Sequence, residues 1–321
     1  MTKGVGGTMT GSGELSHSTQ DPGMSVVVSE RRQLINLAYR LLGSLAEAED
    51  VVQETYARWY AMPREQQEAI ESPGSWLTTV ASRICLDVLR SARYRRERYV
   101  GEWLPEPLPE PAEWPAGAPS DARVDPADRV TLDESVSMAF LVVLESVTPA
   151  ERVAFILHDV FRYSFAEIAE VAGRTPAACR QLASSARRRI RDAEVPAAPA
   201  ARHARIVRDF KAAWEAKDIN ALIGLLDPDA TAIADGGGLA IAFPYPIAGS
   251  EQIAHAWIAI ANSELSSSMT FLECTVNGQP GLVARQGGVT VSVFAFQIAD
   301  NRIKHIWVVR NPEKLRPWTT A

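Results

Sequence analysis

The sequence predicts a multidomain protein in which two all-α units are followed by an α+β unit. The first observation is the spacing of apolar residues, which is typical of amphipathic helices before residue 100 and again after residue 126. The second is an acidic, proline-rich stretch between these two helical blocks. The third is a change of pattern after residue 200, where two helices precede a run of strand-like segments. This order favours a curved, mostly antiparallel sheet packed on helices.

The bulk composition restricts the class of protein. The chain has 321 residues, a formal net charge of −6 and 46% hydrophobic residues, which is ordinary for a folded protein. Its three cysteines show no CxxC or Cys/His ligand spacing, so we expect no disulfide framework, no metal site, no cofactor and a cytoplasmic location. No apolar stretch is long enough to predict a membrane span. Residues 1–24 are rich in Gly, Ser and Thr and are interpreted as a disordered tail.

Residues 25–100 are expected to form the first helical unit. Gly43 interrupts the helical pattern, and Ser44 with Glu47 forms a capping box that begins a new helix. This helix has an apolar stripe that predicts one buried face. Its opposite, solvent-exposed face is expected to carry Asp50, Gln53 and Glu54. A loop and a longer helix follow, and the longer helix is expected to end near Tyr99.

Residues 101–126 are interpreted as an extended linker. Seven prolines lie between Leu104 and Pro126, and residues 101–134 contain nine acids against two arginines. Such a composition disfavours helix and strand and favours a partly polyproline conformation. Residues 195–200, VPAAPA, are interpreted as a second, shorter linker.

Residues 127–194 carry the pattern of a helix-turn-helix. Thr148 and Pro149 begin one helix, and Gly173 ends a short helix that contains AEIAEVAG. Thr175 then caps a further helix with Pro176 at its first position. Two short helices joined by a turn with glycine are typical of DNA-binding helix-turn-helix motifs.

The stretch RTPAACRQLASSARRRIR, which contains most of this last helix, has six arginines and no acid. The first turns of such a helix enter the DNA major groove, where Arg reads guanine and Gln reads adenine, and later arginines hold phosphates. The alternative is a solvated basic helix with no DNA partner. We expect base contacts from the exposed face and phosphate contacts further along: Thr175, Ala177, Ala178, Arg180, Gln181 and Ser184, then Arg187 and Arg188.

A second basic segment covers residues 83–98, with six arginines against two acids and aromatic residues at its edges. Basic charge combined with stacking aromatics is how proteins hold single-stranded nucleic acid. The alternative reading of Trp59 and Trp76 is that they are core residues.

Several motifs of both helical units carry a family resemblance. DVVQETYARWY followed by SWLTTVASRICLDVLRS resembles region 2 of extracytoplasmic-function sigma factors, and the helix-turn-helix block resembles their region 4. The motifs WLPEP, DGGG and NPEKL resemble those of the subgroup of sigma-J type. Members of that subgroup carry a SnoaL-like, nuclear-transport-factor-2-like extension, which here corresponds to residues 201–321.

The resemblance implies an alternative sigma factor that binds core RNA polymerase through its β′ and β subunits and directs it to −35/−10 promoters. The acidic surface of Asp50, Gln53 and Glu54 corresponds to the polymerase-binding surface, and the linker is expected to thread toward the active-site channel. The resemblance implies that the recognition helix binds the −35 element. It implies that the opened −10 element is held by residues of the first unit: Trp76, Thr79, Arg83, Arg90 and Arg93.

The extension is expected to be a cone with an internal cavity that docks on the sigma units, so that no separate anti-sigma protein is required. A small ligand in the cavity is a possible further partner. The regulatory motifs comprise Trp103, Leu104, Pro105, Glu106 and Pro107; Asp235, Gly236, Gly237 and Gly238; and Asn311, Pro312, Glu313, Lys314 and Leu315.

The competing hypothesis is a helix-turn-helix protein fused to a cone-fold enzyme of the cyclase or isomerase kind. An Asp/His pair moves a proton in such enzymes. The candidates on residue type alone are Asp218, Asp235, His255 and His305. Because the sequence places none of them together, we expect the chain not to be an enzyme.

Overall fold

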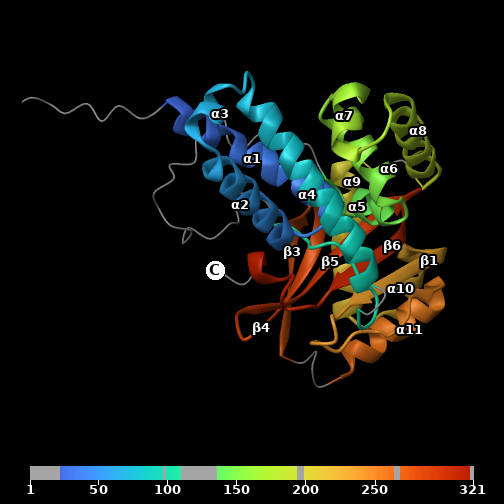
Figure 1. Ribbon diagram of the computed structural model, residues 1–321. Helices are drawn as coiled ribbons and strands as arrows, with labels where there is room; N and C mark the ends of the chain where they lie inside the picture. The colour runs from blue at the N-terminus through green and yellow to red at the C-terminus, as the bar shows by residue number, and fades with distance from the viewer. Residues whose placement is uncertain (1–21, 97–98, 110–135, 194–198, 264–267, 319–321) are drawn as a thin grey trace, which may run out of the picture.

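Helices α1 to α4 form the first helical unit of the computed structural model, which describes residues 22–96, 99–109, 136–193, 199–263 and 268–318 (Figure 1). Their bounds are α1 Pro22–Leu42, α2 Leu45–Ala61, α3 Arg64–Glu68 and α4 Pro73–Arg96. Helix α1 begins at Pro22, so the last three residues of the expected tail are helical. The rest of that tail lies outside the described residues, and α4 ends three residues before the expected Tyr99.

Gly43 and the N-cap Ser44 mark the break between α1 and α2. Gly43 adopts φ 70°, a left-handed conformation that glycine tolerates best. The Ser44 hydroxyl accepts a hydrogen bond from the amide of Glu47 at 3.3 Å. Leucines of α1 and the stripe of α2 that includes Val51, Val52 and Trp59 are buried against α4. This packing turns the acidic face of α2 outward.

The second helical unit contains α5 Met138–Glu145, α6 Pro149–Phe155, the π-helical turn η3 Ile156–Val160, α7 Phe165–Ala172 and α8 Pro176–Ala193. Thr148 and Glu151 form a reciprocal capping box at the start of α6. Gly173 ends α7 with φ 64°, and the Thr175 hydroxyl accepts from the Ala178 amide at 3.2 Å as α8 begins. The predicted helix-turn-helix is therefore present as α7 and α8.

The C-terminal unit is an α+β cone. Its helices are α9 Ala200–Glu215, α10 Ile219–Leu225 and α11 Ser250–Ala261. The strands are β1 Leu226–Asp235, β2 Ile247–Ala248, β3 Met269–Val276, β4 Gln279–Gln286, β5 Val289–Ala299 and β6 Arg302–Val309. They form one six-stranded sheet in the order β2-β1-β6-β5-β4-β3. A short 3-10 helix, η4 Arg316–Trp318, follows β6.

The strand pairing differs from the expected antiparallel run at one place. The pairs from β3 to β6 are antiparallel, but β1 and β6 are parallel. The short strand β2 pairs antiparallel with one edge of β1, and after α11 and the β3–β5 strands the chain places β6 along the other edge, in the same direction as β1. The predicted turn between β5 and β6 is present, because Asp300 and Asn301 have φ 51° and 64°, the signs that a tight hairpin requires.

The two faces of this sheet have different neighbours. The concave face packs on α9 and α11 around aromatic residues that include Phe210, Trp214 and Trp257. The opposite face carries apolar side chains of β4, β5 and β6 that pack on Leu104, Met138 and the C-terminal segment. The two helical units lie side by side over this sheet (Figure 1). None of the helices in the described ranges is long and apolar enough to cross a bilayer.

The beginning of the linker is therefore not an exposed tether. Leu104, Glu106 and Leu108 are all buried, and Pro109 forms an isolated antiparallel bridge with Val276. The physical reason is that leucines and proline rings of this segment supply apolar surface to a sheet face that would otherwise lie in water. Residues 110–135 of the expected linker and second unit lie outside the described residues.

Candidate nucleic-acid interface and its interdomain contacts

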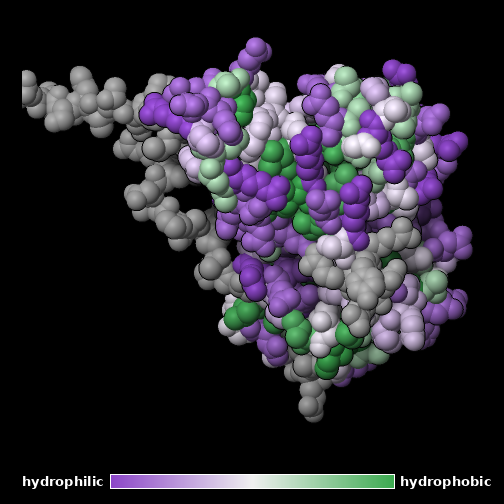
Figure 2. Space-filling model, viewed as in Figure 1, coloured by the Kyte–Doolittle hydropathy of each residue, from purple (hydrophilic) through white to green (hydrophobic). Residues whose placement is uncertain are grey.

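Helix α8 presents a basic face above a buried apolar one. Cys179, Ala183, Ala186 and Ile190 pack inward, and hydrophilic side chains dominate the surface over this helix (Figure 2). Ala178 is half-buried, and the Arg180 guanidinium lies 5.2 Å from the centroid of the Phe165 ring. The other expected base-reading residues are exposed, and so is one of the two phosphate-binding arginines: Thr175, Ala177, Arg180, Gln181, Ser184 and Arg188.

Arg187 differs from the expectation. Its Nη2 donates to both carboxylate oxygens of Asp159 at 2.8 and 2.9 Å, and its Nε donates to the same carboxylate at 3.1 Å. Such a forked pair is strong and directional. In this arrangement Arg187 joins α8 to η3, and its charge is already neutralised. Sequence spacing could not show this, because Asp159 lies 28 residues earlier.

The expected −10 residues lie along α4. Trp76 is half-buried and meets the core residue Trp59 edge to face, with ring centroids 5.2 Å apart. Thr79 is half-buried, and exposed Arg90 pairs with Asp87 at 3.4 Å. Arg93 belongs to α4, but its side chain lies outside the described residues.

Arg83, also on α4, contacts the other helical unit. Its Nη2 donates to the backbone carbonyl of Glu170 in α7 at 3.0 Å. Helix α7 is the first helix of the helix-turn-helix. The basic helix of the first unit and the DNA-binding motif of the second therefore lie directly against each other.

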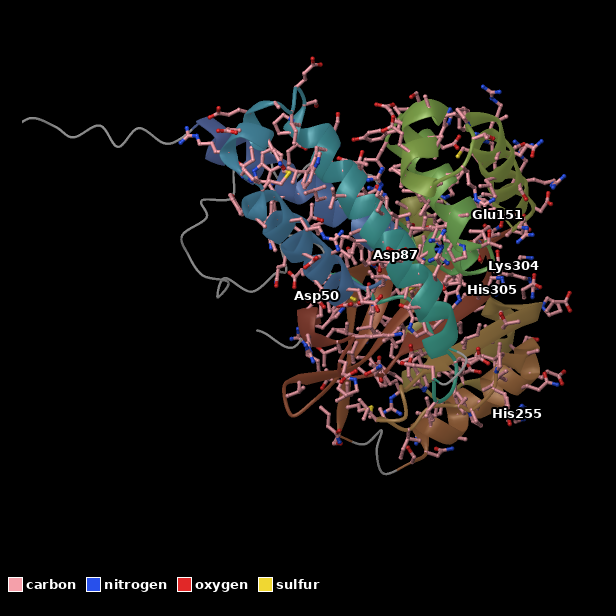
Figure 3. The ribbon with its side chains drawn as sticks, in the orientation of Figure 1. Asp50, Asp87, Glu151, His255, Lys304 and His305 are labelled. Carbon is pink, nitrogen blue, oxygen red and sulfur yellow. The ribbon has the colours of Figure 1, made fainter. Side chains whose placement is uncertain are left out.

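The acidic face of α2 is accessible. Asp50, Gln53 and Glu54 are exposed, and Figure 3 labels Asp50 on this helix. The Glu54 carboxylate accepts from Arg58 Nε at 2.8 Å, an exposed pair one helical turn away. Exposed pairs of this kind contribute little to stability, so this surface is free to exchange partners.

Three predicted motifs meet at the end of β1, in a cluster that we call the Asp235 node: Tyr99, Leu104, Asp235, Asn311 and Lys314. The fully buried Asp235 carboxylate accepts from the Tyr99 hydroxyl at 2.7 Å, from the Leu104 amide at 2.9 Å and from Lys314 Nζ at 2.7 Å. Lys314 also donates to the Leu104 carbonyl and lies 4.1 Å from the centroid of the Trp103 ring. Burial and the neighbouring Asp235 charge raise the pKa of Tyr99 well above its usual range.

The glycines of the DGGG motif allow this close packing. An added Cβ at Gly237 would lie 2.3 Å from Asn311 Nδ2, and one at Gly236 would lie 2.2 Å from the Ala240 carbonyl oxygen. Gly237 and Gly238 have φ of 61° and 71°. Asn311 Nδ2 donates to the Tyr99 hydroxyl at 2.8 Å, and Asn311 Oδ1 accepts from the Glu313 amide at 3.0 Å.

In the rest of the NPEKL motif, Pro312 and Glu313 are exposed and Leu315 is buried in the apolar cluster beneath the linker. The motif therefore contributes both a polar contact to the node and an apolar anchor.

Glu106 joins the linker to the first helical unit. Its carboxylate accepts from the Leu45 amide at 2.8 Å and from the Ser44 hydroxyl at 3.1 Å, where the unpaired amides at the start of α2 attract an anion. Its backbone amide donates to the Gly43 carbonyl at 2.7 Å. Burial raises the pKa of Glu106, against the lowering effect of these hydrogen bonds.

Three contacting residues carried no signal in the sequence. The Tyr39 hydroxyl donates to the Glu106 carbonyl at 2.8 Å, and Asn277 Nδ2 donates to Tyr39 at 2.7 Å. Asn277 also exchanges two hydrogen bonds with the backbone of Leu108, at 2.9 and 3.1 Å. Trp318 Nε1 donates to the Pro107 carbonyl at 2.8 Å. The polar groups of the buried linker are thus bound by α1, by the β3–β4 turn and by the C-terminal segment.

The four candidate catalytic residues do not form one site. Asp218 caps α10 and Asp235 belongs to the node. His255 is exposed on α11, whereas His305 Nδ1 lies 2.5 Å from the Thr231 hydroxyl on β1, and the two histidines lie well apart (Figure 3). In the part of the chain that the structure describes, no group of three or more His, Cys, Asp or Glu residues could hold a metal ion.

Comparison with known protein families identifies the class of protein to which the helical units belong. The model of Sigma-70 region 2 matches residues 26–95, and the model of Sigma-70, region 4 matches residues 137–190. These matches cover the two helical units and include α4, α7 and α8. The two helical units therefore correspond to regions 2 and 4 of proteins of the sigma-70 type.

Two relatives and one solved structure identify a narrower family within this class of protein. The chain is 36% identical over 295 residues to ECF RNA polymerase sigma factor SigJ of Mycobacterium tuberculosis strain H37Rv, which covers 88% of this chain and 90% of the relative. It is 34% identical over 303 residues to the probable ECF sigma factor SigI of that strain, covering 94% and 97%. The crystal structure of the Mycobacterium tuberculosis extracytoplasmic function sigma factor SigJ matches with a TM-score of 0.69 at 34% identity, over 92% of this chain and 98% of that one.

The chain belongs to the extracytoplasmic-function RNA polymerase sigma factors. It is an alternative sigma factor that directs RNA polymerase to promoters. The resemblance stated from the motifs and the predicted fold class, two all-α sigma units plus an α+β cone, are both confirmed.

Proposed function

We propose that the C-terminal cone of this sigma factor holds regions 2 and 4 in a closed arrangement, which must open before both promoter elements can be bound. The observation that carries the proposal is the hydrogen bond of 3.0 Å between Arg83 of α4 and the Glu170 carbonyl of α7. Arg83 is the residue expected to face the −10 bases. Here it binds the unit expected to read the −35 element.

The spacing of the two promoter elements along DNA supports the need for opening. Elements named −35 and −10 are about 25 base pairs apart, which is ~85 Å of B-DNA at about 3.4 Å per base pair. Helix α4 and the helix-turn-helix, when in direct contact, cannot bind both elements of straight duplex DNA at once. Promoter binding therefore requires α4 and α7 to separate.

The cone supplies the contacts that oppose this separation. The Asp235 node ties Tyr99 and Leu104, which follow α4, to the end of β1. Met138, at the start of region 4, packs with Leu104 and Trp307 on the outer face of the sheet. One sheet thus contacts the chain on both sides of the long linker. Core polymerase, which binds the sigma units but not the closed form, would shift the population toward the open form.

In the open form, each of the three exposed helical surfaces has its own role. The exposed face of α8 reads the −35 duplex, α4 holds the opened −10 strand, and the acidic face of α2 binds core polymerase. The cone acts in place of a separate anti-sigma protein and performs no catalysis. The protein works in the cytoplasm, where polymerase and promoter DNA are found.

Energy transfer between two fluorophores tests the proposal. Labels at the exposed positions Glu65 and Asp192 report the separation of regions 2 and 4. We expect high transfer in the free protein and low transfer in holoenzyme bound to a promoter. Lys314→Met, which removes the cation of the node, is expected to lower transfer in the free protein, whereas Lys211→Met in an exposed pair with Glu215 is the matched control. Equal transfer in the free and promoter-bound states would exclude the closed arrangement.

A further inference from the structure

The cone contains an apolar cavity whose lining residues all belong to the cone itself, not to regions 2 and 4. Its volume is about 340 Å³, within the range of sites that bind small organic molecules. Aromatic and aliphatic side chains of α9, α11 and the sheet form most of the wall, including Trp214, Trp257, Phe271 and Phe294. The polar side chains at the wall belong to Ser263, Ser292 and Arg310.

Arg310 is a cation without an acidic partner among the residues that the structure describes. Its Nε donates to the Ser292 hydroxyl at 3.1 Å, and its Nη1 donates to the Ile241 carbonyl. Both acceptors are neutral, and the side chain is half-buried, so the guanidinium has lost part of its hydration without gaining a counter-ion. Desolvation lowers the pKa of Arg310. An anion that enters the cavity would supply the missing charge.

Trp257, which lines the cavity, carries a polar group without a partner. Trp257 is almost fully buried, and its indole N–H has no hydrogen-bond partner. Buried donors of this kind are uncommon and are usually paired with protein, water or ligand. An acceptor atom of a bound ligand that reaches this N–H would satisfy it.

From these observations we infer that the cone binds an amphipathic organic anion, a carboxylic acid with a compact aliphatic or aromatic body. The carboxylate pairs with Arg310, and the apolar body lies among Trp214, Trp257 and Phe294. A neutral molecule of the same shape would leave the guanidinium without a counter-ion. A small inorganic anion would leave the apolar wall unfilled.

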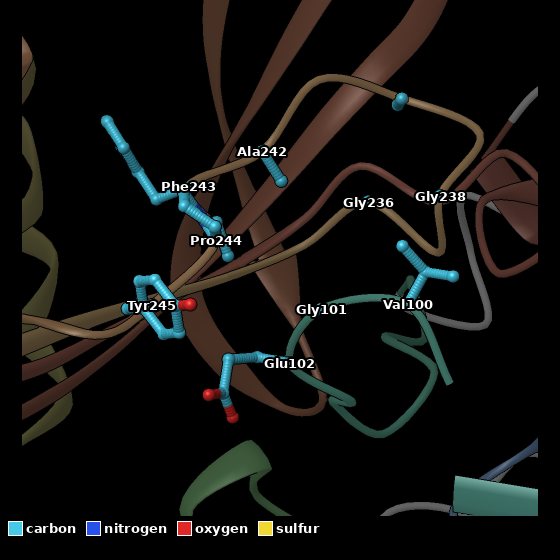
Figure 4. Close-up of a pocket in the computed structure, with 11 residues that line it drawn as sticks. Val100, Gly101, Glu102, Gly236, Gly238, Ala242, Phe243, Pro244 and Tyr245 are labelled. Atoms are coloured by element: carbon cyan, nitrogen blue, oxygen red, sulfur yellow. The ribbon is translucent and has the colours of Figure 1, made fainter. Parts of the chain in front are cut away.

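The position of this site gives its occupant access to the interdomain contacts. A crevice of about 480 Å³ lies between the cone and residues Val100 to Glu102, where the first helical unit meets the linker, and Figure 4 shows Tyr245 and Pro244 across from Glu102. Ala234, Ala242 and Phe243 line both this crevice and the cavity. In addition, the backbone amide of Arg310 donates to the Asp235 carbonyl at 2.7 Å. A ligand that moves Phe243 or Arg310 therefore acts on the wall that faces the linker.

Calorimetric titration of the full-length protein with octanoate and with 1-octanol tests the inference. The two probes share a hydrocarbon chain and differ in charge. We expect octanoate to bind at least about fivefold more tightly than the alcohol, which is typical of a charge-assisted hydrogen bond. In Arg310→Gln this preference should disappear. Arg208→Gln removes an arginine that pairs with Glu273 on the outside of the cone, and it should keep the preference.

A second variant checks the location without altering the charge. Ala256→Phe places a ring at the cavity wall and should weaken binding of both probes at least about tenfold. Equal affinity of the two probes for the wild-type protein, a preference that survives Arg310→Gln, or no binding of octanoate would each overturn the inference. The titration needs neither polymerase nor promoter, so its result is independent of the proposed closed arrangement.

Discussion

The carboxylate of Asp235 and the ammonium of Lys314 lie 2.7 Å apart, and the aspartate side chain has no exposed surface. Both residues belong to the cone, but the other donors to the carboxylate, Tyr99 and Leu104, come from the segment that follows α4. A charge pair inside the cone thus holds a segment of the sigma part. Removal of one partner of a buried pair is much more costly than removal of an exposed one.

Asp235→Ala tests this node directly. We expect faster amide hydrogen exchange in residues 99–109, because the Leu104 amide loses its acceptor and the buried Lys314 loses the Asp235 carboxylate. A cost of about 2 kcal/mol corresponds to roughly 30-fold less protection. The measurement is exchange followed by mass spectrometry. Asp227→Ala, which removes the partner of Lys304 at 2.6 Å elsewhere in the cone, should leave the same peptide protected. Unchanged exchange in Asp235→Ala would show that the node does not hold the linker.

Glu106→Gln should stabilise the linker at high pH. Burial raises the pKa of Glu106, so its folded form prefers the proton more than the unfolded form does. The stabilisation from this group is complete below its unfolded pKa of about 4.5 and is lost as the pH rises through the folded value. Glutamine keeps an acceptor for the Leu45 amide without the charge. The melting temperature of the variant relative to wild type should therefore rise between pH 5 and pH 8, and a falling difference would contradict this account.

His203 should make the cone sensitive to acid. It is buried on α9, and desolvation lowers its pKa to about 4. Its stabilisation is present above the unfolded pKa of about 6.5 and is lost as the pH falls toward 4, by about 3 kcal/mol at about 1.4 kcal/mol per unit. Urea unfolding at several pH values should show a weaker dependence between pH 6.5 and 4 in His203→Gln than in wild type. His255→Gln on the exposed face of α11 is the control and should retain the wild-type dependence.

Asp159→Asn should strengthen the salt dependence of −35 binding. The forked contact to Asp159 occupies Arg187, and its loss would free one more cation for a phosphate. Each phosphate contact adds about −0.9 to the slope of log affinity against log salt concentration. Fluorescence anisotropy of a labelled −35 duplex with holoenzyme at several salt concentrations gives this slope. Asp192→Asn at the exposed end of α8 makes the same charge change without touching Arg187, so an equal slope in both variants would count against the idea.

Substitutions on α8 and α2 should separate promoter recognition from polymerase binding. Arg180→Ala and Gln181→Ala remove exposed residues expected to read bases, and each is expected to weaken use of the −35 element by about 1–3 kcal/mol. Binding to core polymerase should stay at the wild-type level. Asp50→Ala combined with Glu54→Ala should do the reverse, weakening core binding. Abortive transcription and a core-binding titration measure the two effects, and wild-type behaviour of all these variants in both assays would refute the assignments.

Much of the fold could be predicted from local sequence because the signals are short in range. The caps at Ser44, Thr148 and Thr175 each bond an amide three residues later. Gly173 marks the end of α7 through its left-handed backbone, and the hairpin at Asp300 follows the same logic. Three short motifs contain Leu104, Asp235, Asn311 and Lys314 of the Asp235 node, but they include neither Tyr99 nor any sign of the hydrogen bonds.

The sequence by itself determined most of the helices, the basic face of α8 and the family, but it did not indicate α3, which lies where a loop was expected. Tertiary structure alone decided that the linker is buried, that β1 runs parallel to β6 and that Arg83 and Arg187 are already engaged. It also brought together Tyr39 and Asn277, which are 238 positions apart. The reason is physical: caps and periodicity depend on neighbours within one or two turns. The partner of a buried polar group depends on which distant surfaces pack together, and no local pattern encodes that choice.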